Sequence, residues 1–342
     1  MKVLIIGRNA KGGTEYSVFK AFLSAGVDAE FVDSDKYFKQ SILCRIFNKL
    51  RKTPKYLGAG RLNKFVINKV KEFSPDFILF LKPILIYPKT VTELKKYTKV
   101  FSWYPDYIKF TKTSSVDFLN SIPLYNCHFS FNFANAGELE KRGAKKSFFL
   151  PCAADPDIHA PVSISEKEKE KFGADVVFVG TYANEKRSEY LERLCNDGYN
   201  IKIYGDGWKK HPKNSCLWKR KCIQSKALYC EDMSKVLNAS KITLAFVREH
   251  NDETLACRTY EIPATGGFML HQRTAKTAEA LEEDKEGVFF SSYEEMKEKI
   301  DFYLKNEDKR KEIIKNGRER IMHEDLFIHR IRYIVEVFEK LK

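Results

Sequence analysis

Short apolar runs recur along the whole chain, and most of them lead through a glycine or a polar loop into a segment with helical spacing. In the first half these runs occupy residues 3–6, 29–32, 77–81, 100–104, 129–133 and 147–151, and in the second half residues 175–180, 200–205, 241–247, 268–270 and 287–290. An uninterrupted apolar run is typical of a strand covered on both faces, as in a parallel sheet. Because strands alternate with helices through both halves, we expect an α/β fold with two mostly parallel, doubly wound sheets.

The length of 342 residues exceeds what one ordinary core needs and fits two α/β domains. We expect a first domain at residues 1–155, a charge-rich linker at 156–172, a second domain at 173–322 and a final helix at 323–342. Ligands of doubly wound sheets bind outside the carboxyl ends of the strands. Two such sheets facing each other would therefore hold a ligand in a cleft.

The chain is strongly basic, with a formal net charge of +14 and a pI near 9.2. This excess favours an anionic partner, such as nucleic acid, a phosphorylated small molecule or an anionic membrane surface. A generally basic protein without such a partner fits equally well. The chain has neither a signal peptide nor an apolar run near the length of a membrane span, so we expect a cytoplasmic protein.

Eight cysteines are scattered along the sequence. None of them forms a Cys-x-x-Cys pair, so we expect no structural zinc site. In the cytoplasm the thiols should stay reduced and behave as small apolar side chains.

Residues 36–71 combine many lysines and arginines with large apolar side chains. Between Phe38 and Leu50 the apolar positions fall at helical spacing, with Lys39, Arg45, Lys49 and Arg51 around them. The pattern suits a basic amphipathic helix at a membrane surface or facing an acidic acceptor. An ordinary surface helix whose apolar face packs on the core is the more common outcome of such a pattern. Nucleic acid is a weaker alternative, because no nucleic-acid motif accompanies the charge.

Two places in the first half carry candidate binding groups. Gly12 and Gly13 follow the first strand, where backbone N–H groups could approach a phosphate or a sugar, although a tight turn explains them equally well. The surrounding sequence is neither a dinucleotide fingerprint nor a Walker A loop. Asp106 follows the strand at 100–104 and could act as a general base, or it could belong to an ordinary Pro-Asp turn.

The second half repeats the strand, glycine, loop and helix pattern. Gly180 and Thr181 follow one strand, and Lys186 and Arg187 stand near the next helix start, where cations can meet a phosphate. Gly205 and Trp208 follow the next strand, where an aromatic ring could receive a nucleobase or could simply pack.

The stretch from Glu253 to His271 gives the strongest site prediction. Glu253 and Glu261 stand eight positions apart with Arg258 between them, and the helix that we expect to open at Glu261 stops at Gly266 and Gly267. A helix N-terminus attracts anions, and a carboxylate there can accept hydrogen bonds from sugar hydroxyls. The helix, the paired glycine and the buried strand at 268–270 together indicate the ligand edge of an α/β domain.

Four segments resemble the CgeB-like glycosyltransferases of the GT-B superfamily: Phe178-Val-Gly-Thr with Arg187, Ile203–Trp208, Arg258–Gly267, and the tail from Phe289 to Tyr303-Leu304. The resemblance is strongest over residues 173–330, while Lys11–Glu15 and Phe149–Asp155 resemble GT-B first domains. It implies two Rossmann-like domains facing across a cleft, a nucleotide-sugar donor held mainly by the second domain, no metal ion, and a final helix that crosses back to the first domain.

The resemblance also implies roles for single residues. Glu253 and Glu261 match the Glu-x7-Glu element of retaining GT-B enzymes, so Glu261 would bind the donor ribose and Glu253 would approach the transferred sugar. Lys186 and Arg187 match basic residues that neutralise the diphosphate, a contact that Arg258 could equally supply. The first domain offers no counterpart of the histidine of many retaining members, so Asp106 could instead be the base of an inverting mechanism.

These features predict a glycosyltransferase that moves a sugar from a nucleotide-diphosphate-sugar to a glycan or lipid-linked acceptor in cell-surface polysaccharide synthesis. They also allow peripheral contact of the basic first domain with the inner membrane face. A nucleotide-sugar epimerase on the same scaffold and a non-catalytic glycan- or nucleotide-binding protein are the alternatives. Binding to nucleic acid is a weaker one.

Overall fold

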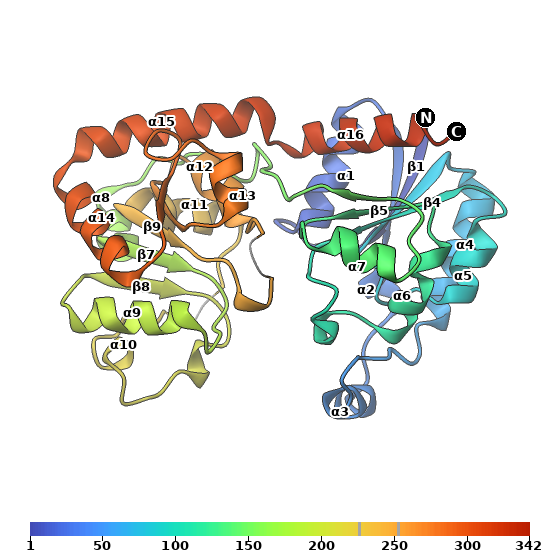
Figure 1. The fold of residues 1–342 in the computed structure, drawn as a ribbon, viewed down its shortest axis with the longest axis horizontal. Coiled ribbons are helices and arrows are strands. Elements are labelled where there is room, and N and C mark those ends of the chain that lie inside the picture. The colour runs from blue at the N-terminus through green and yellow to red at the C-terminus, as the bar shows by residue number, and fades with distance from the viewer. Residues whose placement is uncertain (225–226, 252–253) are drawn as a thin grey trace. The chain divides into compact units, whose positions relative to one another are not determined.

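Two parallel sheets organise the structure, a computed structural model that describes residues 1–224, 227–251 and 254–342 (Figure 1). The chain divides into unit 1, with residues 1–152, 250–251 and 327–342, and unit 2, with residues 153–249 and 254–326. Strands alternate with helices in both units, as the apolar runs predict.

Unit 1 is built on a six-stranded sheet in the order β2-β1-β3-β4-β5-β6, with every neighbouring pair parallel. The strands are β1 (Lys2–Gly7), β2 (Asp28–Asp33), β3 (Phe77–Leu81), β4 (Lys99–Tyr104), β5 (Cys127–Ser130) and β6 (Ser147–Phe149). Successive side chains of a strand point to opposite faces. Phe77 therefore packs beside Phe22 on one face, while Ile78 and Phe80 join the core on the other.

Helices cover both faces of this sheet. They are α1 (Thr14–Ser24), α2 (Ser34–Tyr37), α3 (Ile42–Leu50), α4 (Gly60–Phe73), α5 (Pro88–Leu94), α6 (Val116–Ser121), α7 (Asn135–Lys141) and α16 (Phe327–Glu339), with short 3-10 turns η1 (Thr111–Thr113) and η2 (Ile122–Leu124). The chain's last helix, α16, lies with α1, and its Phe338 ring is 4.9 Å from the ring of Phe77. Arg330 of α16 donates to the carbonyl oxygens of Pro151 and Cys152 at 3.2 and 3.3 Å.

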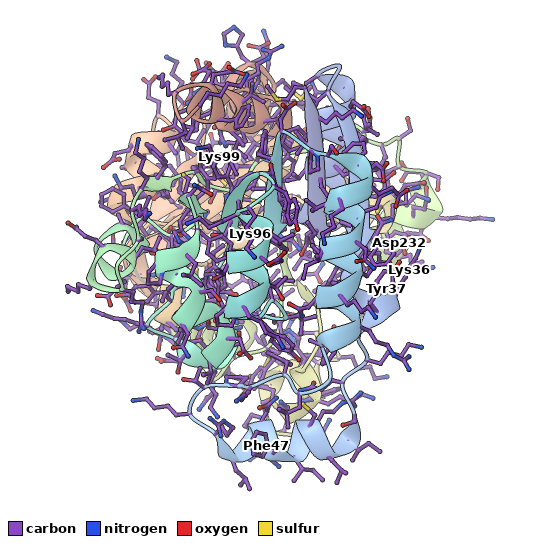
Figure 2. All side chains as sticks on the ribbon, turned by 90° about the vertical axis from the view of Figure 1, so that its right-hand side faces the viewer. Lys36, Tyr37, Phe47, Lys96, Lys99 and Asp232 are labelled. Atoms are coloured by element: carbon purple, nitrogen blue, oxygen red, sulfur yellow. A yellow bond between two sulfur atoms is a disulfide. The ribbon has the colours of Figure 1, made fainter. Side chains whose placement is uncertain are left out.

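The amphipathic segment forms α3, but its apolar face does not pack on the core. Figure 1 shows α3 standing away from the rest of unit 1, and Phe47 lies on this outlying helix in Figure 2. Leu43 and Leu50 are 79% and 85% exposed, whereas Cys44 and Asn48 are buried. The prediction of an ordinary surface helix is therefore wrong in its orientation, because the helix is attached through its small and polar side.

Unit 2 is built on a five-stranded parallel sheet in the order β11-β10-β9-β7-β8. Its strands are β7 (Val176–Val179), β8 (Ile201–Tyr204), β9 (Ile242–Ala245), β10 (Met269–Gln272) and β11 (Val288–Phe290). The helices are α8 (Glu166–Phe172), α9 (Lys186–Asn196), α10 (Cys216–Lys219), α11 (Cys230–Ala239), α12 (Arg258–Ala264), α13 (Ala275–Ala280), α14 (Tyr293–Lys305) and α15 (Glu307–Glu324), with the short turn η3 (Trp208–Lys210). The turn η4 (Glu249–Asn251) begins with the last residue before the chain passes to unit 1.

The core of unit 2 lies mainly between the sheet and helices α9, α10 and α14. Phe178 and Leu244 from the sheet, Leu191 from α9 and Met296 from α14 belong to one buried cluster. Within the described part of the chain, no helix combines the length and the apolar character that crossing a bilayer requires.

Candidate functional site

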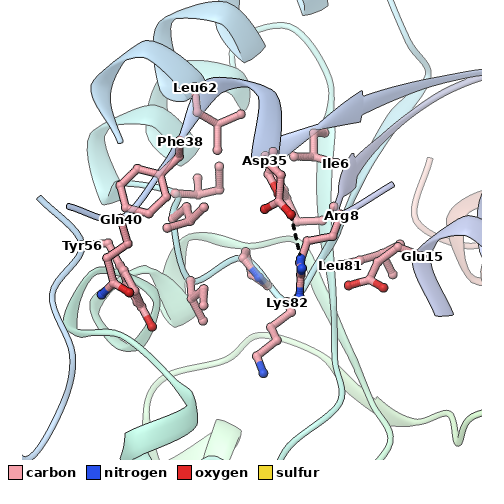
Figure 3. Close-up of a pocket in the computed structure, with 17 residues that line it drawn as sticks. Ile6, Arg8, Glu15, Asp35, Phe38, Gln40, Tyr56, Leu62, Leu81 and Lys82 are labelled. Atoms are coloured by element: carbon pink, nitrogen blue, oxygen red, sulfur yellow. Dashed lines mark hydrogen bonds and ion pairs between the residues drawn. The ribbon is translucent and has the colours of Figure 1, made fainter. Parts of the chain in front are cut away.

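The carboxyl edge of the unit 1 sheet holds a pocket of about 310 Å³ (Figure 3). Apolar side chains such as Leu62 and Phe80 line part of it, and Phe38 and Tyr56 add aromatic rings. Charged side chains line the other part: Arg8, Glu15, Asp35 and Lys82. The pocket thus offers both apolar surface and charge to a ligand.

The first-half candidates lie near this edge. Gly12 and Gly13 lead into α1, and Gly12 has a φ of +85°, which favours glycine. Asp106 follows β4, and its carboxylate is 2.8 Å from the ammonium group of Lys82, a lining residue of the pocket. Burial raises the pKa of Glu15, while the nearby Arg8 and Lys82 oppose that rise. In the sequence Glu15 stands only within the Lys11–Glu15 motif and carries no separate sign of a site.

In unit 2, three loops and one helix start meet at the carboxyl edge of the sheet. Gly180 and Thr181 follow β7, Gly205 follows β8, and α12 begins beyond the loop that leaves β9. A Cβ atom on Gly205 would lie 2.1 Å from the carbonyl oxygen of Gly180, and Gly205 has a φ of +144°. The missing side chain of Gly205 therefore lets the loops after β7 and β8 cross at backbone contact.

The first turn of α12 presents a linked pair of charges. The helix begins at Arg258 rather than at Glu261, which corrects the predicted start and puts both residues in one turn. The Arg258 guanidinium donates through Nε to the Val179 carbonyl oxygen at 3.3 Å and pairs with the Glu261 carboxylate. Side chains three residues apart on a helix lie next to each other, so Arg258 and Glu261 can pair. Glu261 is consequently held at the end of β7.

His159 completes this arrangement. It is buried, its Nε2 atom lies 3.8 Å from the Glu261 carboxylate, and its Nδ1 atom accepts from the backbone N–H of Asp155 at 3.0 Å. In the neutral ring Nε2 then carries the hydrogen and faces the carboxylate. His159 is not predicted from the sequence, because a single histidine in an expected linker carries no pattern.

A second histidine, His271, bonds to the first turn of α12. His271, on β10, donates through Nδ1 to the Gln272 carbonyl oxygen at 2.6 Å, so its Nε2 accepts from the Thr259 hydroxyl at 2.9 Å. Burial lowers the pKa of His271 to about 4, which keeps the ring neutral and this tautomer in place. The bond joins the first turn of α12 to the sheet.

The start of α9 gathers arginines and glutamates. Arg187 is 6% exposed, donates through Nη2 to the Thr181 carbonyl oxygen at 2.8 Å, and has its Nε 3.5 Å from the Glu185 carboxylate. The other oxygen of Glu185 is 3.4 Å from Arg248. Burial, with Arg248 nearby, lowers the pKa of Arg187 to about 10, so it stays charged at neutral pH. Neither Glu185 nor Arg248 belongs to a motif that predicts this role from the sequence.

Within the described part of the chain, Arg187 and Arg248 have unused hydrogen-bond donors close to the start of α9. The Nε atoms of Arg187 and Arg248 are buried and have no hydrogen-bond acceptor among the described residues. The backbone N–H of Lys186, the first residue of α9, donates to the Glu249 carboxylate at 3.0 Å. That carboxylate shows that the helix start attracts negative charge, as the helix dipole requires.

Trp208 does not face a ligand. It is 1% exposed, and its indole N–H donates to the Gly180 carbonyl oxygen at 2.8 Å. Its ring packs against Phe178 and Tyr182 at 6.1 and 5.2 Å. The predicted base-stacking role is corrected, because the indole is used to hold the two loops together.

Gly266 and Gly267 also lie apart from the other candidates. They end α12 and lead into β10, so they lie at the opposite edge of the parallel sheet, near Pro161 and Leu237. A helix that starts at one edge of a parallel sheet must end at the other before the next strand. Their role is in this turn, and the prediction of a ligand contact is wrong. Glu253 lies outside the described residues.

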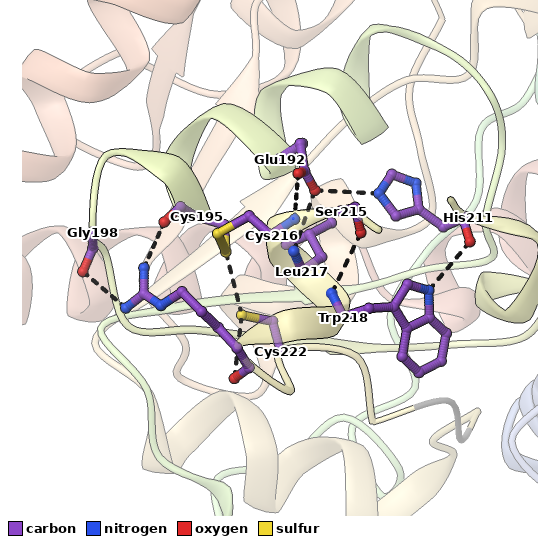
Figure 4. The surroundings of a disulfide bond; sticks show 10 residues. Glu192, Cys195, Gly198, His211, Ser215, Cys216, Leu217, Trp218 and Cys222 are labelled. Carbon is purple, nitrogen blue, oxygen red and sulfur yellow. Dashed lines mark hydrogen bonds and ion pairs between the residues drawn. A yellow bond between two sulfur atoms is a disulfide. The ribbon is translucent and has the colours of Figure 1, made fainter. Parts of the chain in front are cut away.

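A disulfide bond joins Cys195 at the end of α9 to Cys216 at the start of α10 (Figure 4). The Glu192 carboxylate accepts from the backbone N–H of Cys216 at 2.6 Å, and Cys222 approaches Cys195 with a sulfur–sulfur distance of 3.8 Å. The expectation that all thiols are reduced is therefore corrected. Two cysteines 21 positions apart in sequence gave no pattern, and only the packing of α10 against α9 brings them together.

The model of a family described as glycosyl transferase-like matches residues 186–336, somewhat less than half of the chain. This match contains the start of α9 and all of α12. No curated protein sequence matches the chain.

Solved structures match over nearly the whole length. A glycosyltransferase from Rickettsia africae has a TM-score of 0.66 at 14% identity, with 99% of this chain and 98% of that chain covered. Sucrose-phosphate synthase from Thermosynechococcus elongatus has a TM-score of 0.68 at 12% identity, with coverage of 99% and 98%. The Anabaena protein HepE in complex with UDP-glucose has a TM-score of 0.66 at 12% identity, with coverage of 99% and 100%.

At these identities the structural matches show the fold. An α/β chain with parallel sheets of six and five strands is the architecture of GT-B glycosyltransferases, which confirms the predicted fold class. Residues 186–336, which contain the arginines of α9 and the charge pair of α12, are those that resemble a glycosyl transferase in sequence.

Proposed function

We propose that this protein is a glycosyltransferase that uses a nucleotide-diphosphate-sugar, with a UDP-sugar as the first donor to test. The observation that carries the proposal is the pair Arg187 and Arg248, whose buried Nε atoms have no hydrogen-bond acceptor among the described residues. Two guanidinium groups beside a helix start, Arg187 buried and Arg248 with a side chain that is 38% exposed, supply the charge that a diphosphate needs. The Anabaena protein of similar fold, which was solved with UDP-glucose, supports the choice of donor.

In this proposal the charged groups of unit 2 bind the leaving part of the donor. Arg187, Arg248 and Lys186 neutralise the diphosphate as the bond from the sugar C1 to the phosphate oxygen breaks. Glu261, oriented by Arg258 and facing His159, accepts hydrogen bonds from the ribose hydroxyls. Because guanidinium groups can stabilise the developing charge, the reaction needs no metal ion.

The acceptor in this proposal is a glycan or a lipid-linked sugar, and the product belongs to cell-surface polysaccharide. The acceptor's hydroxyl oxygen forms the new bond to C1 as the bond from C1 to the phosphate oxygen breaks, and the hydroxyl proton passes to the leaving nucleoside diphosphate. The unit 1 pocket, with apolar walls and charged side chains, is suited to such an acceptor. We favour retention of configuration on the Glu-x7-Glu spacing of Glu253 and Glu261, and Asp106 is the base to test if the anomeric configuration inverts.

Calorimetric titration tests the donor site with uridine, UDP and UDP-glucose. If Glu261 binds the ribose, Glu261→Gln should weaken both uridine and UDP by about tenfold, as expected for a lost hydrogen bond to a charged group. If Arg258 also contacts phosphate, Arg258→Gln should weaken UDP more than uridine, because uridine loses only the orientation of Glu261 that Arg258 provides. Glu189→Gln, an exposed site on α9, is the control. Equal affinities in all variants would remove the ribose and phosphate assignments.

Activity is tested by following nucleotide release and product mass with an acceptor panel, with and without a chelator. Transfer that survives the chelator supports the proposal. Isomerisation of the free nucleotide sugar without an acceptor would instead indicate an epimerase. Binding without any turnover would indicate a non-catalytic protein, and activity restored only by magnesium or manganese would contradict the metal-free reaction.

A further inference from the structure

Helix α3 exposes the side that a surface helix normally buries. With 100° between successive residues, its five large apolar side chains cover an arc of about 140°. All five are exposed: Ile42 (73%), Leu43 (79%), Ile46 (56%), Phe47 (40%) and Leu50 (85%). Scattered apolar residues are common on protein surfaces, but a continuous apolar arc on one helix indicates a contact surface.

The attachment of α3 leaves this arc free of the core. Asn48 accepts from the backbone N–H of Lys55 at 2.8 Å, and the Cys44 thiol lies 3.8 Å from the Lys55 carbonyl oxygen. The N-cap hydroxyl of Ser41 accepts from the Cys44 backbone N–H at 3.2 Å. These bonds are on the side opposite the apolar arc, so the orientation of the helix is set by polar contacts rather than by burial of its apolar face.

The charges around the arc are all of one sign. Between residues 36 and 71 the chain has eleven basic residues (Lys36, Lys39, Arg45, Lys49, Arg51, Lys52, Lys55, Arg61, Lys64, Lys69 and Lys71) and no aspartate or glutamate. Arg45, Lys49 and Lys52 are exposed on α3 or next to it. Beside the helix, Lys36, Lys39 and Arg61 line a hollow of about 430 Å³ together with Tyr37 and Leu57.

We propose that α3 docks on an anionic lipid bilayer surface. The apolar arc enters the boundary between headgroups and acyl chains, while the basic side chains and the hollow contact lipid phosphates. A second copy of the chain would bring two uniformly basic segments together, which Coulomb repulsion opposes. A nucleic acid would satisfy the lysines and arginines but would leave the five apolar side chains in water.

Docking through α3 would place the unit 1 pocket next to the bilayer. Phe38, Gln40 and Tyr56, which flank α3 in sequence, line that pocket, and Phe38 also lines the basic hollow. A pocket in this position is suited to a ligand whose head group projects from the membrane. The docking itself rests on α3 alone and stands whether or not the chain transfers sugars.

Vesicle co-sedimentation tests the proposal with the full chain and phosphatidylcholine vesicles with or without phosphatidylglycerol. The wild type should bind the anionic vesicles, less strongly at high salt. Replacing Leu43, Ile46 and Leu50 together by glutamine should weaken binding by about a hundredfold, because three apolar side chains no longer enter the lipid. Since these side chains are exposed, the thermal unfolding temperature should not change.

A charge-matched pair of variants separates docking from general basicity. Arg45→Gln, Lys49→Gln and Lys52→Gln together should weaken binding by about tenfold or more. Lys95→Gln, Lys99→Gln and Lys145→Gln remove the same charge from another basic cluster of unit 1, where burial and the nearby Lys145 and Lys99 lower the pKa of Lys95, and should leave binding unchanged. Lys99 lies far from Phe47 in Figure 2.

Three results would overturn the proposal. Unchanged vesicle binding by the Leu43, Ile46 and Leu50 variant would show that the arc does not enter lipid. A wild-type dimer that this variant converts to a monomer in sedimentation equilibrium would assign the arc to a second copy. Duplex DNA binding that both α3 variants abolish, without vesicle binding by the wild type, would assign the surface to nucleic acid.

Discussion

The carboxyl edges of the two sheets both carry charged side chains but use them differently. In unit 2, Arg187 and Arg258 each bond to a backbone carbonyl of the β7 segment and pair with a glutamate. In unit 1, Arg8 pairs with Asp35 through side chains that are 69% and 56% exposed, beside an open pocket. Fixed charges suit one ligand geometry, whereas mobile charges around apolar walls can adjust to several. We infer a preorganised donor side and an adaptable acceptor side.

The largest effect should come from the fixed charges of unit 2. Arg187→Gln should lower kcat by about 10²–10³, because a preorganised group that stabilises a leaving diphosphate is removed. Arg187→Lys should recover part of the loss, since the ammonium group keeps the charge but lacks the fork that reaches both Thr181 and Glu185.

Arg193→Gln is the matched control for Arg187. Arg193 lies on the same helix and pairs with Glu294 at 2.9 Å on the surface, so its loss should leave turnover unchanged. Thermal unfolding separates lost folding from lost chemistry. A folded Arg187→Gln variant with wild-type kcat would contradict the preorganised donor side.

The next effect concerns the rigidity of unit 2. Loss of the Cys195–Cys216 disulfide should lower the free energy of unfolding by about 3 kcal/mol, the cost expected from releasing a loop of this length. Cys216→Ser in calorimetry should show this, and Cys230→Ser, at a free cysteine, should not. Thiol titration of the unreduced, denatured chain should count six free thiols. A count of eight would show that Cys195 and Cys216 are not joined by a disulfide bond.

A smaller effect should follow from the loop crossing that supports the donor side. Gly205→Ala should cost about 2 kcal/mol or more, because the new Cβ meets the Gly180 carbonyl at a backbone conformation that disfavours alanine. Gly198 has a φ of +95° and open space around it, so Gly198→Ala reports the backbone term alone. Equal costs at the two positions would show that the loops after β7 and β8 do not need their close approach.

The sequence predicts the fold more completely than it predicts the site. Apolar runs locate the strands because each buried strand is a local pattern, and glycine with basic residues after a strand located Gly180, Thr181 and Arg187. Partners that come from distant segments left no such pattern. Arg248 follows β9 and His159 lies before α8, and only the folded chain brings them to Glu185 and Glu261.

The sequence pattern also does not show which face of a helix is attached to the rest of the domain, or whether an aromatic side chain binds a ligand or is buried. The amphipathic pattern of α3 was visible, but Asn48 and Cys44 determine which side is attached. Trp208 fits a base-stacking position by sequence, yet its N–H bond to Gly180 buries it. In both cases one or two hydrogen-bonded side chains, rather than the sequence pattern, set the outcome.

We expect the smallest effect from Glu15, which lines the unit 1 pocket that we infer to be adaptable. The glutamates of the unit 2 edge are paired with cations, whereas among the described residues no cation lies within ion-pair distance of Glu15, and burial raises its pKa. A carboxyl group whose pKa is higher in the folded chain stabilises the fold below its unfolded pKa, and this contribution is lost as pH rises through the folded value. Glu15→Gln should therefore raise the unfolding temperature slightly at neutral pH and not at acidic pH. The exposed Glu140→Gln should show no such difference. If the Glu15 variant is less stable at neutral pH instead, its carboxylate is held by the unit 1 pocket as firmly as Glu261 is held in unit 2, and the contrast between the two edges fails.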